Sequence, residues 1–463
     1  MFHSRNPIYR NPTGAVQAHT NIHFKLLVPR EFRCSAARLM IGEEFTKQVK
    51  TLGLFWCGMN GEDHEWWECD FTPEQSGLYF YRFEIDTWRG TLGITSRFGG
   101  ESGIDEYGAP EGECWQLTVF ESQYQTPDWL SGGIMYQIFP DRFYRSGTTK
   151  YNVPQDRYLH QRWGSQPEWR PNHQGEITNS DYFGGDLEGI IQKLDYLQSL
   201  GITCIYLNPI FEAHSNHRYD TADYTKVDPL LGTKEDFKRL CKEANKRGIH
   251  IMLDGVFNHT GSDSIYFNRK GRYQTLGAYQ SQESPYYDWY QFYQWPEQYA
   301  CWWNFETLPN VNETNETYNA YINGTDGVIQ TWLKAGADGW RLDVADELPD
   351  LFLDDITKAA KQVKPTSMIL GEVWEDASNK MAYGQRRRYL LGKQLDSVMN
   401  YPFREAIIGF LTGKNPAEMM ELIMTVLEHY PPSAIHLLMN HIGTHDTERI
   451  LTVLGGEPLN GRD

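Results

Sequence analysis

The first part of the chain alternates apolar and polar residues with a period of two. Clear runs are NIHFKLLV, TLGLFWCG, GLYFYRFEI and CWQLTVF, separated by turns rich in Gly, Pro and Asn. This period is typical of strands that bury one face. Roughly seven such runs precede residue 125, so we expect an N-terminal β-sandwich domain over residues 1–124. The stretch QTPDWLSGG, residues 125–133, marks the expected boundary.

This domain could be a carbohydrate-binding module, a dimerisation surface or a wall beside an active site. Trp56, Trp66, Trp67 and Trp88 could stack on sugars, but packing in the core is the interpretation that we favour.

After residue 125 the pattern changes to apolar strands that alternate with amphipathic helices, which predicts a (β/α) barrel over residues 125–463. The expected strands are residues 134–139, 202–208, 249–257, 337–344, 368–373, 394–400 and 434–440. Helices are expected at residues 187–200 and 234–248. An insertion rich in Tyr, Trp and Gln, about residues 261–324, follows the third strand, and long loops of this kind are usually functional. The active site of such a barrel lies at the carboxyl ends of its strands.

The stretch GWRLDVADE, residues 339–347, carries the central chemistry. Period-two alternation places Arg341 and Asp343 on the same side of a short strand. A neighbouring guanidinium lowers the pKa of a carboxyl group and keeps it ionised, as a carboxylate nucleophile requires. An Arg–Asp pair that braces a strand end would give the same spacing, and the spacing alone favours that interpretation.

Two further carboxylates follow later strands: Glu372 in GEVWEDA and Asp446 in GTHDTER. The segment DGVFNH, residues 254–259, ends the third strand with a histidine. Carboxylates on separate loops are what glycosidic cleavage needs, one as an ionised nucleophile and one as a protonated acid.

These segments, in this order, resemble the regions shared by glycoside hydrolase family 13, the α-amylase family, from about residue 134 to the end. VADELP, LPNVN (residues 308–312) and MNYPFR (residues 399–404) resemble the neopullulanase, cyclomaltodextrinase and maltogenic amylase subgroup. The front β-domain is similar to the starch-binding-type module of that subgroup. The implied fold is a (β/α)8 TIM barrel behind a β-sandwich.

The resemblance implies that Asp343 is the nucleophile, Glu372 the general acid/base and Asp446 the third carboxylate, which holds substrate hydroxyls. In a retaining enzyme, the carboxyl groups of Asp343 and Glu372 would lie roughly 5–5.5 Å apart. Arg341 would orient the nucleophile.

Further residues are implied to bind the substrate. His259 and His445 would hydrogen-bond the sugar at the cleavage subsite, and Tyr219 would stack on it, with His217 beside it. Glu347 matches a residue associated with acceptor-site effects.

Other assignments leave alternatives. Asp254 and Asn258 look like supports of their loop, and the two histidines could instead be satisfied polar residues at loop starts. Trp303 and Trp374 could equally pack in the core. No Cys or His spacing indicates a metal site. The subgroup often binds calcium after the first strand, but residues 145–152 lack its acidic run and only Asp186 matches. A structural calcium ion is therefore an open alternative with little support in the sequence, and the reaction itself requires no cofactor.

Composition narrows the partners. The net charge of −18 argues against nucleic acid and anionic membranes and is compatible with a neutral glucan. The 7 cysteines indicate reduced, mostly buried thiols, and no apolar run resembles a signal peptide or a membrane span, so we expect a cytoplasmic protein. The subgroup further suggests a homodimer through the N-terminal domain.

The expected function is retaining hydrolysis of α-1,4 glucosidic bonds, with α-1,6 bonds as a further target, in maltooligosaccharides, cyclodextrins, pullulan or starch. The alternatives are a transglycosylase or α-1,6-glucosidase on the same barrel, and a catalytically silent glucan-binding protein. The motifs do not distinguish the hydrolase from the transglycosylase or the α-1,6-glucosidase. Because only residues 447–463 follow Asp446, with no eighth strand and no C-terminal β-domain, we also expect this chain to be a fragment of a longer enzyme.

Overall fold

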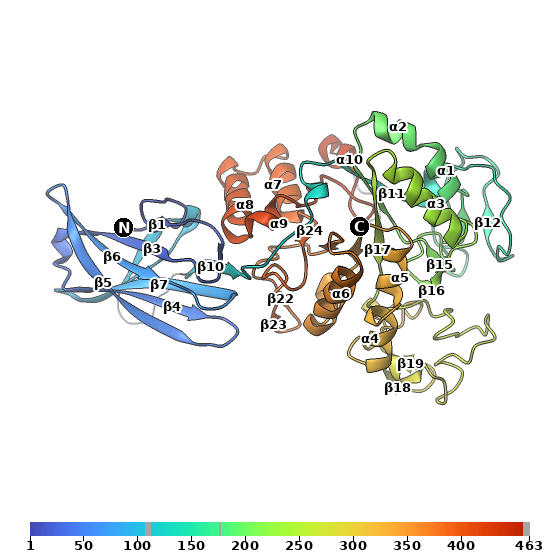
Figure 1. Cartoon of the computed structure of the whole chain (residues 1–463), viewed down its shortest axis with the longest axis horizontal. Helices are drawn as coiled ribbons and strands as arrows, with labels where there is room; N and C mark the ends of the chain where they lie inside the picture. Colours follow the sequence, from blue (N-terminus) through green and yellow to red (C-terminus); the bar gives the residue numbers. More distant parts are fainter. Residues whose placement is uncertain (107–112, 176, 457–463) are drawn as a thin grey trace. The chain divides into compact units, whose positions relative to one another are not determined.

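The computed structural model describes residues 1–106, 113–175 and 177–456 (Figure 1). The chain forms two compact units. One consists of residues 1–125 together with residues 373–463, and the other of residues 126–372.

The first unit begins with the β-rich domain. Its strands are β1 Arg10–Asn11, β2 Val16–Gln17, β3 Ile22–Pro29, β4 Ala36–Glu43, β5 Val49–Asn60, β6 His64–Phe71, β7 Gly77–Thr87, β8 Gly90–Ser96, β9 Ser102–Glu106 and β10 Trp115–Phe120, with 3-10 turns η1 Arg30–Phe32 and η2 Phe98–Gly100. The pairing order is β1-β3-β6-β5-β4-β7-β10-β2, and off this path β8 pairs with β7 and β9 pairs with β8. Strand β5 pairs with β4 through its first half and with β6 through its second half, so it passes from one layer of the sandwich to the other.

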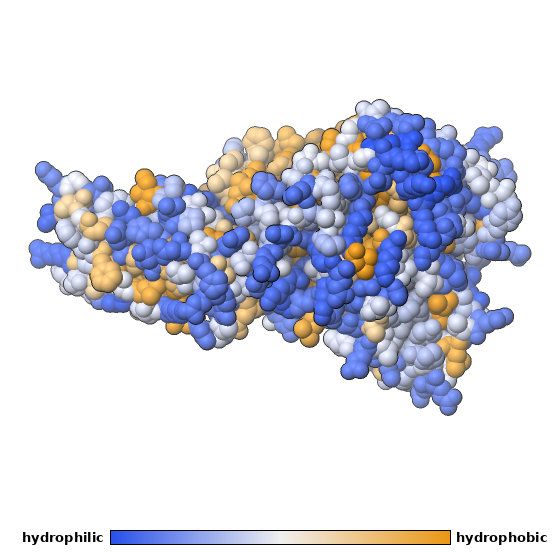
Figure 2. Space-filling view, viewed as in Figure 1, coloured by the Kyte–Doolittle hydropathy of each residue, from blue (hydrophilic) through white to orange (hydrophobic). Residues whose placement is uncertain are grey.

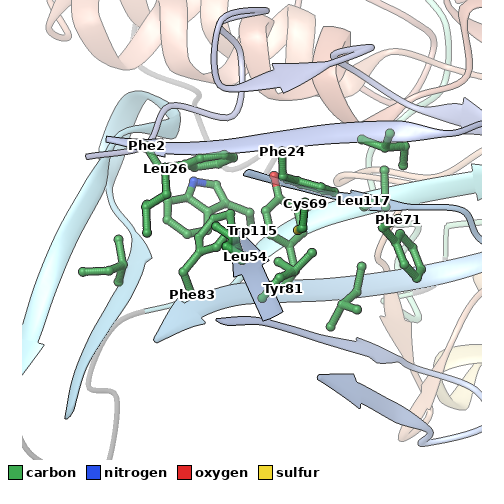
Figure 3. Close-up of a cluster of buried hydrophobic side chains, with 14 of the residues drawn as sticks. Phe2, Phe24, Leu26, Leu54, Cys69, Phe71, Tyr81, Phe83, Trp115 and Leu117 are labelled. Atoms are coloured by element: carbon green, nitrogen blue, oxygen red, sulfur yellow. The ribbon is translucent and has the colours of Figure 1, made fainter. Parts of the chain in front are cut away.

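The core of this domain is built from the inward-facing residues that the alternating pattern predicts. In β3, every second side chain from Ile22 to Val28 is buried. Aromatic rings fill the centre (Figure 3). The ring centroids of Phe2 and Trp115 lie 4.7 Å apart, and those of Phe24 and Tyr81 lie 5.2 Å apart. Such ring contacts add to the apolar burial that stabilises the sandwich.

The tryptophans of the sandwich divide between core and surface. Trp67 is buried, whereas Trp56 and Trp88 are more than half exposed, so the core interpretation is wrong for these two. The seven cysteines are all free in the described chain, but only Cys69, Cys204 and Cys241 are buried, which corrects the expectation of mostly buried thiols.

The same unit ends in a helical segment. It contains β22 Met381–Ala382, β23 Gln385–Arg386, β24 Ser397–Val398, α7 Tyr401–Leu411, α8 Pro416–His429, α9 Pro432–Ile435 and α10 Ile450–Gly455. The expected strand at residues 434–440 is wrong: its start belongs to α9, and only Met439 forms a parallel bridge, with Met399. Pro432 explains the difference, because proline is well placed in a first helical turn and cannot donate to a sheet.

Arg5 joins this helical segment to the sandwich. It donates to both carboxylate oxygens of Glu421 at 2.8 Å and to Glu428 at 2.7 Å, both on α8. Apolar residues gather over α7 and α8 (Figure 2), where Phe410, Leu411 and Met420 are exposed.

The second unit contains a parallel sheet. Strands β11 Met135–Ile138, β14 Cys204–Leu207, β17 His250–Gly255, β20 Gly339–Leu342 and β21 Met368–Gly371 pair in this order. Its helices are α1 Leu187–Gln192, α2 Leu194–Ser199, α3 Lys234–Asn245, α4 Glu316–Asn323, α5 Val328–Lys334 and α6 Asp350–Val363. Together with the sandwich, this parallel half-barrel confirms the expected fold class, a (β/α)8 barrel preceded by a β-sandwich.

The loops of this unit carry short elements. These are η3 Asp128–Leu130, η4 Pro140–Arg142, β12 Tyr158–Leu159, β13 Asp181–Tyr182, β15 Phe211–Ala213, β16 Thr221–Val227, η5 Tyr287–Trp289, β18 Phe292–Gln294, β19 Gln298–Tyr299, η6 Trp302–Asn304 and η7 Ala345–Glu347. A later part of the long insertion returns to the loop after β17, where the backbone N–H of Val311 donates to the carbonyl of Asn258 at 3.1 Å.

Candidate active site

A single guanidinium organises the carboxylates at the end of the parallel sheet. Arg341 is fully buried on β20, and its Nη1 donates to Asp343 at 2.7 Å and to Asp254 at 2.9 Å. Its Nη2 forms an ion pair with Glu372 at 3.0 Å. Asp254 lies on β17, Asp343 follows β20 and Glu372 follows β21. Three neighbouring strands therefore deliver three carboxylates to one cation.

The backbone after Asp343 is strained in a way that also positions Glu372. Val344 has φ 40° and ψ 57°, a left-handed conformation that β-branched residues rarely adopt. In this conformation its backbone N–H donates to Glu372 Oε2 at 2.7 Å. Strain of this kind persists only where the surroundings impose it, and it often marks functional sites.

The pKa of Asp343 differs from the sequence expectation. Burial raises the pKa of Asp343 well above its ordinary value, and the charges of Glu372 and Asp254 add to this effect. Arg341 acts in the expected direction but is outweighed. Burial also raises the pKa of Asp254. The cluster therefore retains a proton to higher pH than separate carboxylates would, which is a condition for general acid chemistry.

Tyr219 contacts the same cluster. Its hydroxyl donates to Asp254 Oδ2 at 2.9 Å and accepts from Asn208 at 3.0 Å. His217 accepts at Nδ1 from the backbone N–H of Tyr219 at 3.1 Å. The resemblance placed both residues at the site, and the structure brings them to its carboxylates through Asp254.

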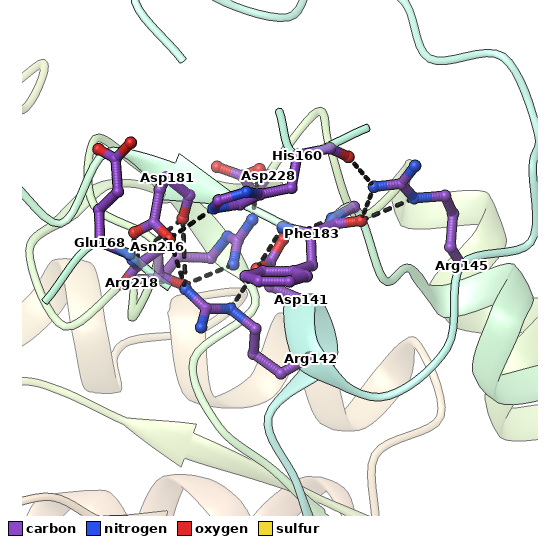
Figure 4. Close-up of polar contacts among 11 residues, drawn as sticks. Asp141, Arg142, Arg145, His160, Glu168, Asp181, Phe183, Asn216, Arg218 and Asp228 are labelled. Carbon is purple, nitrogen blue, oxygen red and sulfur yellow. Dashed lines mark hydrogen bonds and ion pairs between the residues drawn. The ribbon is translucent and has the colours of Figure 1, made fainter. Parts of the chain in front are cut away.

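The loop that carries His217 and Tyr219 is fixed by a buried polar network (Figure 4). Arg218, between them, donates to Asp228 at 3.2 Å, and Arg157 donates to both oxygens of Asp228 at 2.7 and 2.9 Å. Because Asp228 is fully buried and satisfied by these cations, the loop has little freedom to move.

His259 follows β17, as Asp343 follows β20, so both lie beyond the carboxyl ends of paired strands. Burial lowers the pKa of His259 to about 4, so the imidazole is neutral at neutral pH. Its ring stacks on Trp302 of the insertion, with centroids 5.5 Å apart. A neutral buried imidazole can donate or accept a hydrogen bond but does not act as a cation.

The remaining candidates have surroundings of their own. Asp446 and His445 belong to the other unit, where His445 Nε2 lies 3.2 Å from Asp446 Oδ2. Glu347 ends the short turn η7 that follows Asp343. Beside Glu347, the structure adds Glu313, a buried carboxyl group whose pKa burial raises to about 8, with the charge of Glu347 contributing. Nothing in the sequence pattern distinguishes Glu313 from exposed glutamates.

The two tryptophans with open alternatives are both exposed. Trp303 has 73% of its surface exposed and Trp374 has 45%. Trp374 stacks on Tyr401 at 4.1 Å and lines a cavity of about 300 Å³ together with Arg404 and Lys414. Core packing is therefore wrong for both residues.

The position that could have suggested calcium is already neutralised. Asp186 pairs with the ammonium of Lys150 at 2.8 Å and accepts from Ser146 Oγ at 2.6 Å. Over residues 1–106, 113–175 and 177–456, no group of three or more His, Cys, Asp or Glu side chains could hold a metal ion.

Comparison with known protein families shows one match that covers most of the chain. The model of the α-amylase catalytic domain matches residues 137–461. This protein belongs to the α-amylase family. The match includes Asp343, Glu372 and Asp446 and confirms the family resemblance of the motifs.

Relatives of this α-amylase family member include amylopullulanases, a name that the motifs did not suggest, and cyclomaltodextrinases, a name that they did. An amylopullulanase of Thermoanaerobacterium saccharolyticum is 37% identical over 98% of this chain and 38% of its own length. A cyclomaltodextrinase of Geobacillus thermopakistaniensis is 38% identical over 86% of this chain and 67% of its own length. A solved type III pullulan hydrolase from Thermococcus kodakarensis is 29% identical, with TM-score 0.61, and covers 99% of this chain and 75% of its own.

The chain spans between about a quarter and two fifths of the length of the amylopullulanases that it matches. Within the described residues, no helix is both long and apolar enough to cross a bilayer.

Proposed function

We propose that this chain is a retaining glycoside hydrolase that cleaves α-1,4 glucosidic bonds in maltooligosaccharides, cyclodextrins, pullulan or starch, with α-1,6 bonds as a further target. The observation that carries the proposal is the bonding of Arg341 to both Asp343 and Glu372. Membership of the α-amylase family and relatives named amylopullulanase and cyclomaltodextrinase support the same substrate class.

In the proposed reaction, Asp343 attacks the anomeric carbon while the protonated carboxyl group of Glu372 donates its proton to the leaving oxygen. The glycosyl ester formed on Asp343 is then attacked by water, and Glu372 takes the proton back. Two inversions retain the configuration. This chemistry requires no cofactor.

The other proposed roles concern the substrate. His259, His217 and Tyr219 would hold the sugar at the cleavage point. Asp446 would hold substrate hydroxyl groups, and His445 would hydrogen-bond the sugar. Glu347 would act at the acceptor side. A neutral glucan also fits the net charge of −18, because it neither gains nor loses Coulomb energy on approach.

The wider assignments also remain proposals. We propose a sandwich domain over residues 1–124 and a catalytic domain over residues 125–463 with an inserted subdomain at about 261–324. Homodimerisation through the sandwich and a cytoplasmic location are further proposals, the first testable by light scattering at micromolar concentration.

The decisive experiment is product analysis on pullulan, β-cyclodextrin and starch, with proton NMR of the first products. We expect α-anomers first, and β-anomers would refute the retaining mechanism. Transfer products in place of glucose and maltose would favour the transglycosylase alternative.

The variant Asp343→Asn separates an enzyme from a binding protein. We expect turnover to fall by more than about a thousandfold, because the nucleophile is lost, while binding of maltohexaose by calorimetry persists. Near-normal hydrolysis by this variant would contradict the assignment of the nucleophile. Wild-type binding without any turnover would favour the silent glucan-binding alternative.

A further inference from the structure

Trp303 is an exposed aromatic residue held in an unfavourable backbone conformation. Its φ and ψ are 47° and 35°, and the next residue, Asn304, also has a positive φ of 62°. A bulky side chain in the left-handed region carries a conformational cost, which asparagine tolerates better. The fold accepts this cost and leaves 73% of the Trp303 surface in solvent.

The surrounding hairpin fixes the position of this indole. The backbone N–H of Trp302 donates to the carbonyl of Leu308 at 3.0 Å, and that of Leu308 donates to Phe305 at 2.8 Å. Asn310 donates to Ala300 at 3.0 Å across the base of the hairpin. The turn that presents Trp303 is therefore ordered before any ligand arrives, which reduces the entropic cost of binding.

The indole belongs to a ladder of rings that begins at the candidate active site. Trp303 stacks on Trp302 with centroids 5.3 Å apart and an interplanar angle of 24°. Trp302 in turn stacks on His259 at 5.5 Å and 26°. His259 is fully buried beyond the end of β17, so the ladder runs from the buried end of the site to solvent.

We propose that Trp303 is a substrate-positioning residue that stacks its open face on a glucosyl unit of a bound maltooligosaccharide, next to the units held at the cleavage point. The apolar C–H face of a pyranose matches a flat indole, and the exposed amide of Asn304 lies beside it for hydroxyl groups. This proposal rests on the proposed function, because it takes an α-glucan as the substrate. The subsite would favour substrates long enough to span both the cleavage point and the indole.

The variants that test this are Trp303→Asn and Trp303→Phe. Asparagine suits the positive φ and removes the ring, whereas phenylalanine keeps a smaller ring. Tyr293→Asn is the matched control, because Tyr293 is 68% exposed in the same insertion but lies outside the ladder. Thermal melts would first establish that all three variants fold.

The measurement is KM and kcat on maltotriose and maltohexaose. For Trp303→Asn we expect KM for maltohexaose to rise about fivefold to tenfold, as the loss of one aromatic stacking contact implies, with kcat changed less than about twofold. Trp303→Phe should recover part of the loss, and Tyr293→Asn should match the wild type. A wild-type KM in Trp303→Asn, or an equal rise in Tyr293→Asn, would overturn the proposal.

A second measurement separates this proposal from the proposed function. Calorimetry with maltohexaose in the Asp343→Asn background reports binding without turnover. If the wild type hydrolyses α-glucans but Trp303→Asn binds maltohexaose as tightly as its parent, only the stacking subsite is refuted. If the wild type hydrolyses no glucan but its binding of maltohexaose weakens in Trp303→Asn, the subsite stands and the hydrolase is refuted. The absence of any maltohexaose binding would refute both.

Discussion

Glu313 is a buried carboxyl group whose ionisation the fold opposes. Only 8% of its surface is exposed, and burial raises its pKa from 4.5 to about 8, with the charge of Glu347 adding to the effect. We predict that Glu313→Gln stabilises the protein at alkaline pH and leaves stability nearly unchanged at pH 5. Glutamine keeps the shape of the protonated side chain but cannot become charged.

The sign follows from proton binding. Between its ordinary pKa of 4.5 and its folded-state value of about 8, Glu313 holds a proton in the folded protein and releases it in the unfolded chain. The folded state then binds more protons, so the stability of the wild type falls as pH rises through this window. Glu313→Gln lacks this titrating group, so its stability should not show this fall with rising pH.

The shift in the pKa of Glu313 sets an upper limit on the gain in the free energy of unfolding, and the expected gain is smaller than this limit. One pKa unit corresponds to about 1.4 kcal/mol, so the raised pKa of Glu313 sets an upper limit of roughly 5 kcal/mol. Because a charged side chain can turn toward water and relieve part of this cost, we expect Glu313→Gln to gain about 1–3 kcal/mol at pH 9.

The assay is urea unfolding followed by circular dichroism at pH 5, 7 and 9, at one ionic strength. Glu283→Gln is the control, because it removes one exposed carboxylate from the same insertion. A stability difference between Glu313→Gln and the wild type that is constant across pH, or a variant less stable at pH 9, would refute the reasoning.

Two further predictions concern ion pairs. Arg5→Ala removes two hydrogen bonds to Glu421 and one to Glu428, whose side chain is only 6% exposed. We expect this variant to destabilise the first unit by about 2–4 kcal/mol, and an unchanged melting curve would contradict the prediction. Burial acts to raise the pKa of Asp228, but its two arginine partners lower it overall, so its contribution to stability is present above about pH 4 and is lost at lower pH. Asp228→Asn should therefore cost about 3–5 kcal/mol at pH 7 in thermal unfolding, with a smaller deficit below pH 4, and a deficit independent of pH would count against this account.

The strands of the barrel could be predicted because buried parallel strands are short apolar runs. Residues 204–207, 250–255, 339–342 and 368–371 all form strands inside the predicted ranges. The same signal failed at residues 434–440, where an apolar run follows two prolines and begins as a helix. An apolar run alone does not distinguish a strand from a buried helix.

The exposure of the aromatic residues could not be predicted for a different physical reason. A tryptophan gives the same sequence signal in a core and on a stacking surface. Trp67 and Trp56 pair across β6 and β5, yet Trp67 is buried and Trp56 is exposed, and the register of the pairing shifts between Trp56 and Gly58. Trp303 reaches solvent only through a left-handed turn that no residue pattern in the hairpin specifies.

For Asp343, the sequence predicted the contact with Arg341 correctly but the direction of the pKa shift wrongly. Arg341 and Asp343 are two residues apart, so their bond follows from strand geometry. Asp254 and Glu372 reach the same guanidinium from neighbouring strands, and this sharing depends on sheet order. With all three carboxylates ionised, the cluster has two more negative charges than positive ones, so retaining one proton relieves repulsion in a buried site. In the proposed reaction the remaining negative charge faces an oxocarbenium-like transition state, whose positive charge it would stabilise. Burial is the main cause of the raised pKa of Asp343 in the free protein, and the negative charge of Glu372 and Asp254 that adds to it is the feature that would favour the transition state.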